Sequence, residues 1–349
     1  MTPTFRRAVG IAASLVLTTP LICWGSGPAY FVVEGRLAAF DGAATQKFSL
    51  IADAGKTIPL SKIERVWGTL PDGRVIVSLP LETANRLDDP SGRDEPLRGP
   101  FLLVRPDGSV DAFLPENILR AFPSPATGDI ALITRERRLL LWSNGATKEV
   151  ETPGRVSAAA WSPDGRRLAL TVYPPDWSQH RVNEARTTAE FLRLQNADIY
   201  LADGATGALL AQLTDSPDTE YGAFFGPDGV TLYYVWLHLT EDQGGLMRLI
   251  LDADGGTTAT GAPVKLTVAG NDPGETPLGR VGTYMWTPDR ARLVFEAGRP
   301  DGSGEIWTMA GDGSSARMMA AGRFPQVTVG GRIAYQKQDG QPALLEVQP

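Results

Sequence analysis

The sequence predicts an all-β chain folded as a β-propeller, and three observations carry this prediction. One turn phrase built around Pro-Asp-Gly recurs along the chain, a β-rich run follows each copy, and two further short strands follow in most units. Four short strands in a unit of roughly 40 to 65 residues are typical of a propeller blade. A sandwich would not reuse one hairpin phrase so often, and a parallel β-helix has shorter repeats.

The recurring phrase has the chemistry of a hairpin turn. Proline presets φ for the second position, aspartate bonds the local backbone, and glycine adopts the positive φ that closes the turn. Aromatic side chains before the turns are expected to pack between neighbouring blades. The copies, from clearest to loosest, are Trp161-Ser162-Pro163-Asp164-Gly165, Phe225-Gly226-Pro227-Asp228-Gly229, Trp286-Thr287-Pro288-Asp289-Arg290, Leu70-Pro71-Asp72-Gly73 with Trp67 upstream, Ser124-Pro125-Ala126-Thr127-Gly128-Asp129, and Val329-Gly330-Gly331-Arg332.

Six copies of the phrase predict six blades. The piece from Phe324 to Val347 supplies only three clear strands. We therefore expect residues 30–52 to complete the last blade, so that the N- and C-terminal segments close the ring and leave no open sheet edge. Seven blades result instead if residues 30–52 pair separately.

Several of these residues carry a family resemblance. The turn Trp161–Gly165, the strand Leu168–Leu170, the strand Ile199–Leu201 and the ending Gln212–Thr214 resemble the repeat of TolB-type (WD-like) propellers. The resemblance covers residues 60–335 and is strongest at 155–215. It implies the blade architecture but no activity. It extends to the propeller only, because the chain lacks room for the separate N-terminal α/β domain of the full TolB translocation protein.

The N-terminus has the order of an export signal. Arg6 and Arg7 precede the uncharged apolar stretch from Ala8 to Trp24, and small residues follow from Gly25 to Ala29. This pattern predicts a signal peptide over residues 1–29 and one propeller domain over 30–349. An uncleaved anchor is the alternative, and membrane contact is expected only in that case. The protein is expected in the periplasm or outside the cell, reached by the general or the twin-arginine route.

Composition narrows the partners. The net charge is −7, and no basic stripe runs along the chain, so nucleic acid is excluded as a partner. The runs Arg135–Arg138 and Arg166-Arg167 are interpreted as solvated strand ends. The single cysteine, Cys23, lies in the export segment and follows Ile22 rather than the small residue that lipidation requires.

The predicted topology places the long connections together. Pro-Asp-Gly turns join strands one and two, so they gather on one face of the disc. The long connections gather on the opposite face, where loops held by a rigid scaffold usually bind. They are residues 80–100, 173–197, 214–221, 237–245, 268–282 and 298–304. The binding face predicted from them comprises Asp176, His180, Arg181, Glu220, Tyr221, His238 and Asp242.

The longest connection runs from Pro174 to Ala197. Its middle, Asn183 to Gln195, has apolar residues spaced among charges and could form a short helix. One interpretation is a lid over apolar surface of a neighbouring blade. The other is a platform that binds a ligand or partner.

Residues that could support catalysis are few. The two histidines, His180 and His238, fall on the same predicted face, with Asp176, Glu184, Glu241 and Asp242 nearby in sequence. Such a set could hold a divalent metal, and propeller lyases that act on pectin fragments, which resemble TolB-type propellers, use such sites. No metal-binding spacing and no Gly-x-Ser-x-Gly elbow are present.

Two function classes remain. We favour a non-catalytic module that binds a protein or peptide of the cell envelope, with no cofactor. The alternative is a propeller enzyme, a metal-assisted lyase or a hydrolase acting on a sugar or lactone, that uses His180 and His238.

Overall fold

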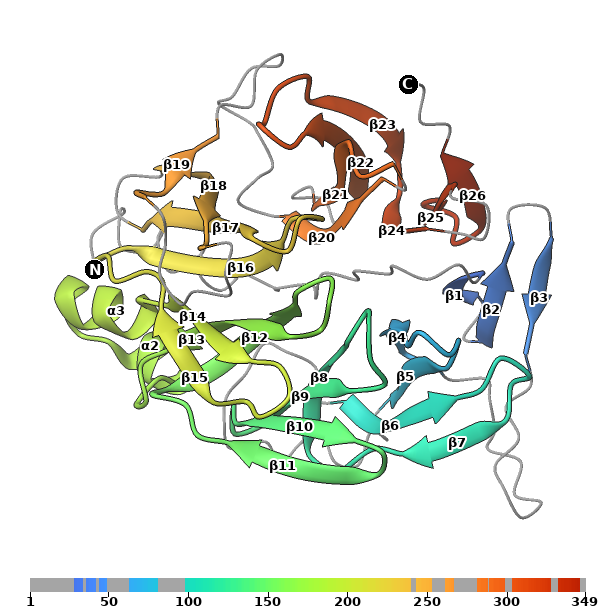
Figure 1. Ribbon diagram of the computed structural model, residues 1–349, viewed down its shortest axis with the longest axis horizontal. Coiled ribbons are helices and arrows are strands. Elements are labelled where there is room, and N and C mark those ends of the chain that lie inside the picture. Colours follow the sequence, from blue (N-terminus) through green and yellow to red (C-terminus); the bar gives the residue numbers. More distant parts are fainter. Residues whose placement is uncertain are drawn as a thin grey trace.

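The computed structural model forms a ring of seven antiparallel sheets (Figure 1). Each sheet is one blade, and the first strand of each blade lies innermost, against the first strands of neighbouring blades. The residues that the structure describes are 28–33, 36–41, 44–48, 63–80, 98–239, 243–252, 261–266, 281–287, 289–298, 303–327 and 332–345.

The first three blades use the N-terminal part of the chain. Blade 1 has three strands, and blades 2 and 3 have four each. Their strands in order are β1 (Ala29–Val33), β2 (Arg36–Phe40), β3 (Thr45–Lys47), β4 (Arg65–Thr69), β5 (Val75–Pro80), β6 (Arg98–Val104), β7 (Val110–Phe113), β8 (Ile118–Pro123), β9 (Ile130–Thr134), β10 (Leu139–Ser143) and β11 (Ala146–Val150).

Blades 4 to 6 have four strands each, and blade 7 has three. Two helices, α2 (Gln179–Glu184) and α3 (Thr188–Gln195), interrupt blade 4 between its second and third strands. The strands are β12 (Arg155–Trp161), β13 (Arg167–Tyr173), β14 (Asp198–Asp203), β15 (Leu209–Gln212), β16 (Thr219–Phe225), β17 (Thr231–His238), β18 (Gln243–Ile250), β19 (Val264–Lys265), β20 (Val281–Trp286), β21 (Arg292–Gly298), β22 (Gly304–Ala310), β23 (Arg317–Ala321), β24 (Arg323–Val327), β25 (Ile333–Gln336) and β26 (Pro342–Leu345).

The prediction of an all-β propeller is confirmed, but the prediction of six blades is wrong. Residues 30–52 were expected to complete the last blade. Instead β1 pairs along its whole length with β2, and β2 pairs with β3. These strands form a sheet of their own beside β24–β26. One edge of β1 is therefore paired within blade 1, and seven blades result.

The turns behave as the phrase predicts. The amide of Gly165 donates to the carbonyl of Ser162 at 2.9 Å, and Gly165 has φ +72°. Asp164 accepts from the amide of Arg166 at 3.0 Å. In the third copy Arg290 takes the glycine position at φ +61° and makes the same bond to Thr287 at 2.7 Å. The hairpin geometry thus survives the loss of the glycine.

Apolar side chains hold the blades together in pairs. Seven clusters of buried residues lie in the described part of the chain, and each contains side chains from two or three successive blades, with one cluster joining blades 7 and 1. The aromatic before each turn contributes. Trp161 donates its indole N–H to the carbonyl of Phe122 in blade 3 at 2.9 Å, and Trp286 donates to Phe225 in blade 5 at 3.2 Å. The expected packing between blades is confirmed.

Side-chain amides join the first and last blades. The backbone N–H of Tyr30 donates to Oε1 of Gln326 at 2.9 Å, and Nε2 of Gln326 donates back to the carbonyl of Tyr30 at 2.6 Å. Nε2 of Gln336 donates to the carbonyl of Val32 at 2.8 Å. Gln326 is 2% exposed, so these bonds are shielded from water. The ring closes by packing and amide bonds rather than by a shared sheet.

Trp161 should be essential for stability. Replacing it with alanine removes a side chain that is 2% exposed between two blades, so we expect the free energy of unfolding to fall by about 3–5 kcal/mol. W161F keeps most of the apolar contact and loses only the bond to Phe122, so about 1 kcal/mol is expected. Thermal or denaturant unfolding of both variants measures this. An unchanged midpoint for W161A would contradict the inter-blade role.

Candidate binding face

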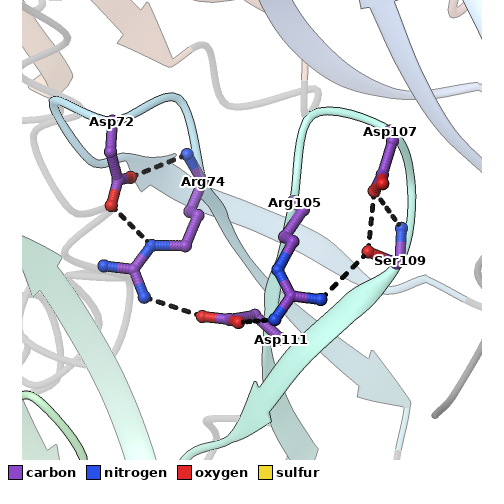
Figure 2. Close-up of polar contacts among 6 residues, drawn as sticks. All are labelled: Asp72, Arg74, Arg105, Asp107, Ser109 and Asp111. Carbon is purple, nitrogen blue, oxygen red and sulfur yellow. Dashed lines mark hydrogen bonds and ion pairs between the residues drawn. The ribbon is translucent and has the colours of Figure 1, made fainter.

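Charged side chains on the turn face of blade 2 pair with one another. On the turn face of blade 2, Arg74 donates to Asp72 and to Asp111, at 2.7 Å each, and Arg105 donates to Asp111 (Figure 2). These pairs link the turn between β4 and β5 to the turn between β6 and β7. Charge on this part of the turn face is therefore balanced within one blade.

The helical insert, defined here as residues 174–197, lies on the opposite face. Ser178 caps α2 by accepting from the amide of Arg181, and Thr187 caps α3 by accepting from Glu190. The helix expected at 183–195 is confirmed in α3. The other helix, α2, begins earlier, and the chain leaves helical geometry at Ala185.

The insert covers apolar surface of blade 5. Its buried side chains belong to the same cluster as Tyr221, Leu237 and Leu239. Those side chains are Val182, Ala185, Phe191 and Leu194. The lid interpretation is thus the one that the packing supports, while the outer surface of the insert stays exposed.

Asp176 joins the two helices of the insert to each other. It accepts hydrogen bonds from Arg193 at 2.8 and 2.9 Å and from Arg181. These bonds from Arg193, together with the charge of Arg181, hold the pKa of Asp176 at about 2. The predicted site residues Asp176 and Arg181 therefore lie together, within the insert itself.

The two histidines have different neighbours. His180 lies 3.0 Å from Glu184 one helical turn away, and His238 lies 3.7 Å from Asp218. Within the described ranges no group of three or more His, Cys, Asp or Glu side chains is arranged to hold a metal ion. Nothing in the described geometry gathers a metal-ligand set around either histidine.

Carboxylates gather where blades 4 and 5 meet. We call Asp198, Asp215, Asp218 and Glu220 the acidic cluster. Glu220 is 3% exposed, and its Oε1 accepts from the hydroxyl of Ser216. Thr214 donates to Asp198 at 3.4 Å, and Trp236 donates to Asp218 at 2.8 Å. Asp218 thus lies beside His238, and its charge also acts on Glu220.

Burial changes the protonation of this cluster. Burial, with the charges of Asp198 and Asp218, raises the pKa of Glu220 to about 7 despite the bond from Ser216. Burial and the charge of Asp215 raise the pKa of Asp198 to about 6. Desolvation disfavours the charged form of a carboxyl group, and like charges add to the effect. Both groups therefore exchange protons near neutral pH.

Two predicted residues remain, Tyr221 and Asp242. Tyr221 follows Glu220 in β16 but points to the other side, where it is 2% exposed in the core beneath the insert. Asp242 lies outside the described residues. Of the predicted binding residues that the structure describes, three lie in the insert, two lie at the acidic cluster and one lies in the core: Asp176, His180 and Arg181, then Glu220 and His238, then Tyr221.

One arginine on the long-loop face differs from the sequence-based expectation. The run Arg135–Arg138 was interpreted as solvated, which is wrong for Arg137 because its side chain is 7% exposed. Its guanidinium lies 5.1 Å from the ring of Trp177, a residue of the insert. This contact could not be predicted from the sequence, because Arg137 and Trp177 are far apart along the chain.

Comparisons with known proteins place the chain by fold. No protein-family model matches it, and no curated protein matches it. Among solved structures it is similar to TolB from Acinetobacter baumannii, with 15% identity, a TM-score of 0.46, and coverage of 79% of this chain and 64% of that one.

Two further solved structures are similar. An oligogalacturonate lyase in complex with manganese has 13% identity and a TM-score of 0.48, covering 76% of this chain and 68% of that one. A chain of the mitotic checkpoint complex has 12% identity and a TM-score of 0.55, covering 95% and 90%. At these identities the similarity concerns the fold alone. In the part of the chain that the structure describes, no helix is long and apolar enough to cross a bilayer.

The acidic cluster predicts a pH dependence. The pKa of Glu220 is about 7 in the folded chain and near 4.5 when unfolded, so the folded state binds more protons between these values. Stability should therefore fall as pH rises from about 4.5 to about 7.5. E220Q removes this carboxyl and should be more stable than the parent at pH 8 by about 1–3 kcal/mol.

Denaturant unfolding at several pH values measures this. E184Q, on the exposed surface of the insert, is the matched control and should leave the pH slope unchanged. Equal slopes in the parent and E220Q would show that Glu220 titrates normally.

Proposed function

We propose that this protein is an exported β-propeller that binds a protein or peptide of the cell envelope through its long-loop face, without catalysis. The observation that carries the proposal is the asymmetry of the two faces. On the turn face, short connections join the first and second strands of the blades, and charges are paired on blade 2. The other face carries an ordered insert with an exposed outer surface. Ordering such a segment costs conformational entropy, which a contact with a partner can offset.

The geometry around the histidines supports binding rather than chemistry. His180 lies beside Glu184, and His238 lies beside Asp218. A nucleophile with an adjacent base, or three ligands for a metal, would be needed for the enzyme alternative. The described contacts of His180 and His238 include neither a nucleophile–base pair nor a set of three metal ligands.

Export is supported by the sequence and by the start of the ring. β1 begins at Ala29, which is 1% exposed, and cleavage after Ala29 would remove the first residue of this strand. Cleavage after Gly25 would leave β1 intact. We therefore propose a mature chain that begins at Ser26 and lies in the periplasm or outside the cell. N-terminal sequencing of the exported protein tests this, and a chain that still begins at Met1 would favour the anchor.

Surface variants test the binding face. Deleting the insert would expose Leu237 and Leu239, so substitutions on its outer surface are cleaner. N183R/A189R places bulk and charge on exposed positions of the insert, and A205R/A208R does the same on the turn face. We expect the first pair to weaken partner binding at least tenfold and the second to change it less than twofold.

Partners are captured from envelope extract on the immobilised mature chain, identified by mass spectrometry, purified and titrated against each variant. H180A/H238A should bind as the parent does. If N183R/A189R and A205R/A208R bind the partner equally well, the long-loop face is excluded as the binding surface. If H180A/H238A loses both partner binding and a metal that the parent protein holds, the enzyme alternative is supported instead.

A further inference from the structure

The C-terminal end of the insert is tied to the start of blade 5 by hydrogen bonds, and we call this contact the insert junction. The bonds run from the hydroxyl of Thr219 to the carbonyl of Gln195 at 2.6 Å, from Nδ2 of Asn196 to the carbonyl of Ser216 at 3.0 Å, and from the amide of Glu220 to the carbonyl of Ala197 at 2.8 Å. Main-chain groups of the insert are thus held by the residues that lead into β16.

Glu220 places a buried carboxyl group at the insert junction. Its Oε1 accepts from the hydroxyl of Ser216. Its Oε2 has no hydrogen-bond partner among the described residues, although the hydroxyl of Thr214 acts on the same carboxyl group. A buried carboxyl group that is incompletely bonded is more stable as the neutral acid than as the anion.

The charges that face Glu220 are mainly negative. Asp198, the first residue after the insert, acts on it from β14, and Asp218 acts on it from the connection before β16. The titratable groups around this carboxyl group are Asp198 and Tyr200 in β14, Asp215 and Asp218 in the connection, and Tyr234 and His238 in β17. Ionisation of Glu220 therefore adds a negative charge beside others of the same sign, across the insert junction.

Cations in the other elements packed near the insert junction are bonded to different groups. Arg193 in α3 donates to Asp176, Arg155 in β12 donates to the carbonyls of Glu136 and Pro175, and Arg167 in β13 donates to the carbonyl of Gly229. These bonds direct the three guanidinium groups to acceptors other than the carboxyl group of Glu220.

Protonation of Glu220 is therefore coupled to docking of the insert. Burial, with the charges of Asp198 and Asp218, raises the pKa of Glu220 to about 7, whereas a carboxyl group released into water titrates near 4.5. The docked state thus binds more protons than the undocked state between these values. Undocking should become more favourable as pH rises from about 4.5 to about 7.

We propose that Glu220 is a pH-sensitive latch, whose ionisation favours release of the C-terminal end of the insert from blade 5. With Glu220 protonated, the insert stays docked over the apolar surface that includes Tyr221, Leu237 and Leu239. With Glu220 ionised, repulsion from Asp198 and Asp218 favours the undocked end, and this surface opens. The inference goes beyond the proposed function, because it concerns how the insert is held rather than what the long-loop face binds.

Hydrogen exchange of the mature chain at pH values of about 5.5 and about 8 tests the latch. Protection factors, which correct for the pH dependence of intrinsic exchange, are compared for residues 188–197 and for β9 in blade 3. Protection of 188–197 should fall at least fivefold at the higher pH, and that of β9 less than twofold. In E220Q, which removes the ionisable group, residues 188–197 should change less than twofold. E184Q, on the exposed surface of the insert, should behave as the parent does.

Two further variants keep the test decisive. If E220Q unfolds early, D198N decides, because loss of the facing charge should make the fall in protection at least twofold smaller. H238Q tests titration of His238 as the rival cause and should keep the fall seen in the parent. No fall in the parent, an equal fall in E220Q, or loss of the fall in H238Q would overturn the latch. So would an equal fall in 188–197 and β9, because Glu220 would then act on the whole ring.

Discussion

Closure of the ring between blades 7 and 1 is the constraint on which the other features depend. Each blade is a twisted sheet that cannot bury its apolar surfaces alone, so every blade needs a neighbour on both sides. The cluster that contains Phe31, Phe40 and Ala334 fills the last of these interfaces. Gln326 then satisfies both backbone polar groups of Tyr30 in a place that water does not reach.

Closure also brings distant residues to one face. The first strands begin on the same side of the disc, so Arg155 near the start of β12 and Glu220 near the start of β16 lie toward that side. The insert then bridges blades. It covers the core near Tyr221 in blade 5 and accepts bonds from Arg155 through Pro175. The insert and the acidic cluster near blades 4 and 5 thus lie on the same side of the ring.

Much of the fold could be predicted from local chemistry. The Pro-Asp-Gly phrase encodes a turn through its own backbone preferences, and the turn at Gly165 forms as expected. Packing of the preceding tryptophan between blades could also be predicted, because aromatic residues recur at that position of the repeat. The seventh blade could not be predicted by counting the phrase, since the turn of blade 1 between Val33 and Arg36 lacks it.

The site was harder to predict, for two physical reasons. Every residue of β16 is buried, so the strand shows no alternation that would separate Glu220 at the acidic cluster from Tyr221 in the core. Arg137 is buried by Trp177, and that contact exists only once the insert has folded back over blade 3. The positions of the loops therefore predicted on which side of the ring these residues lie, but not which of their side chains are exposed.

Backbone hydrogen exchange at β1 tests the closed seven-bladed ring most directly. In a closed ring the amide of Tyr30 is bonded to Gln326 and buried, so residues 29–33 should exchange as slowly as the innermost strand β12. Exchange followed by mass spectrometry or NMR on the mature chain measures both segments at once. Slow exchange at both would support closure through blade 1. Fast exchange at 29–33, with β12 still protected, would show that the first blade is not docked and that the ring is open.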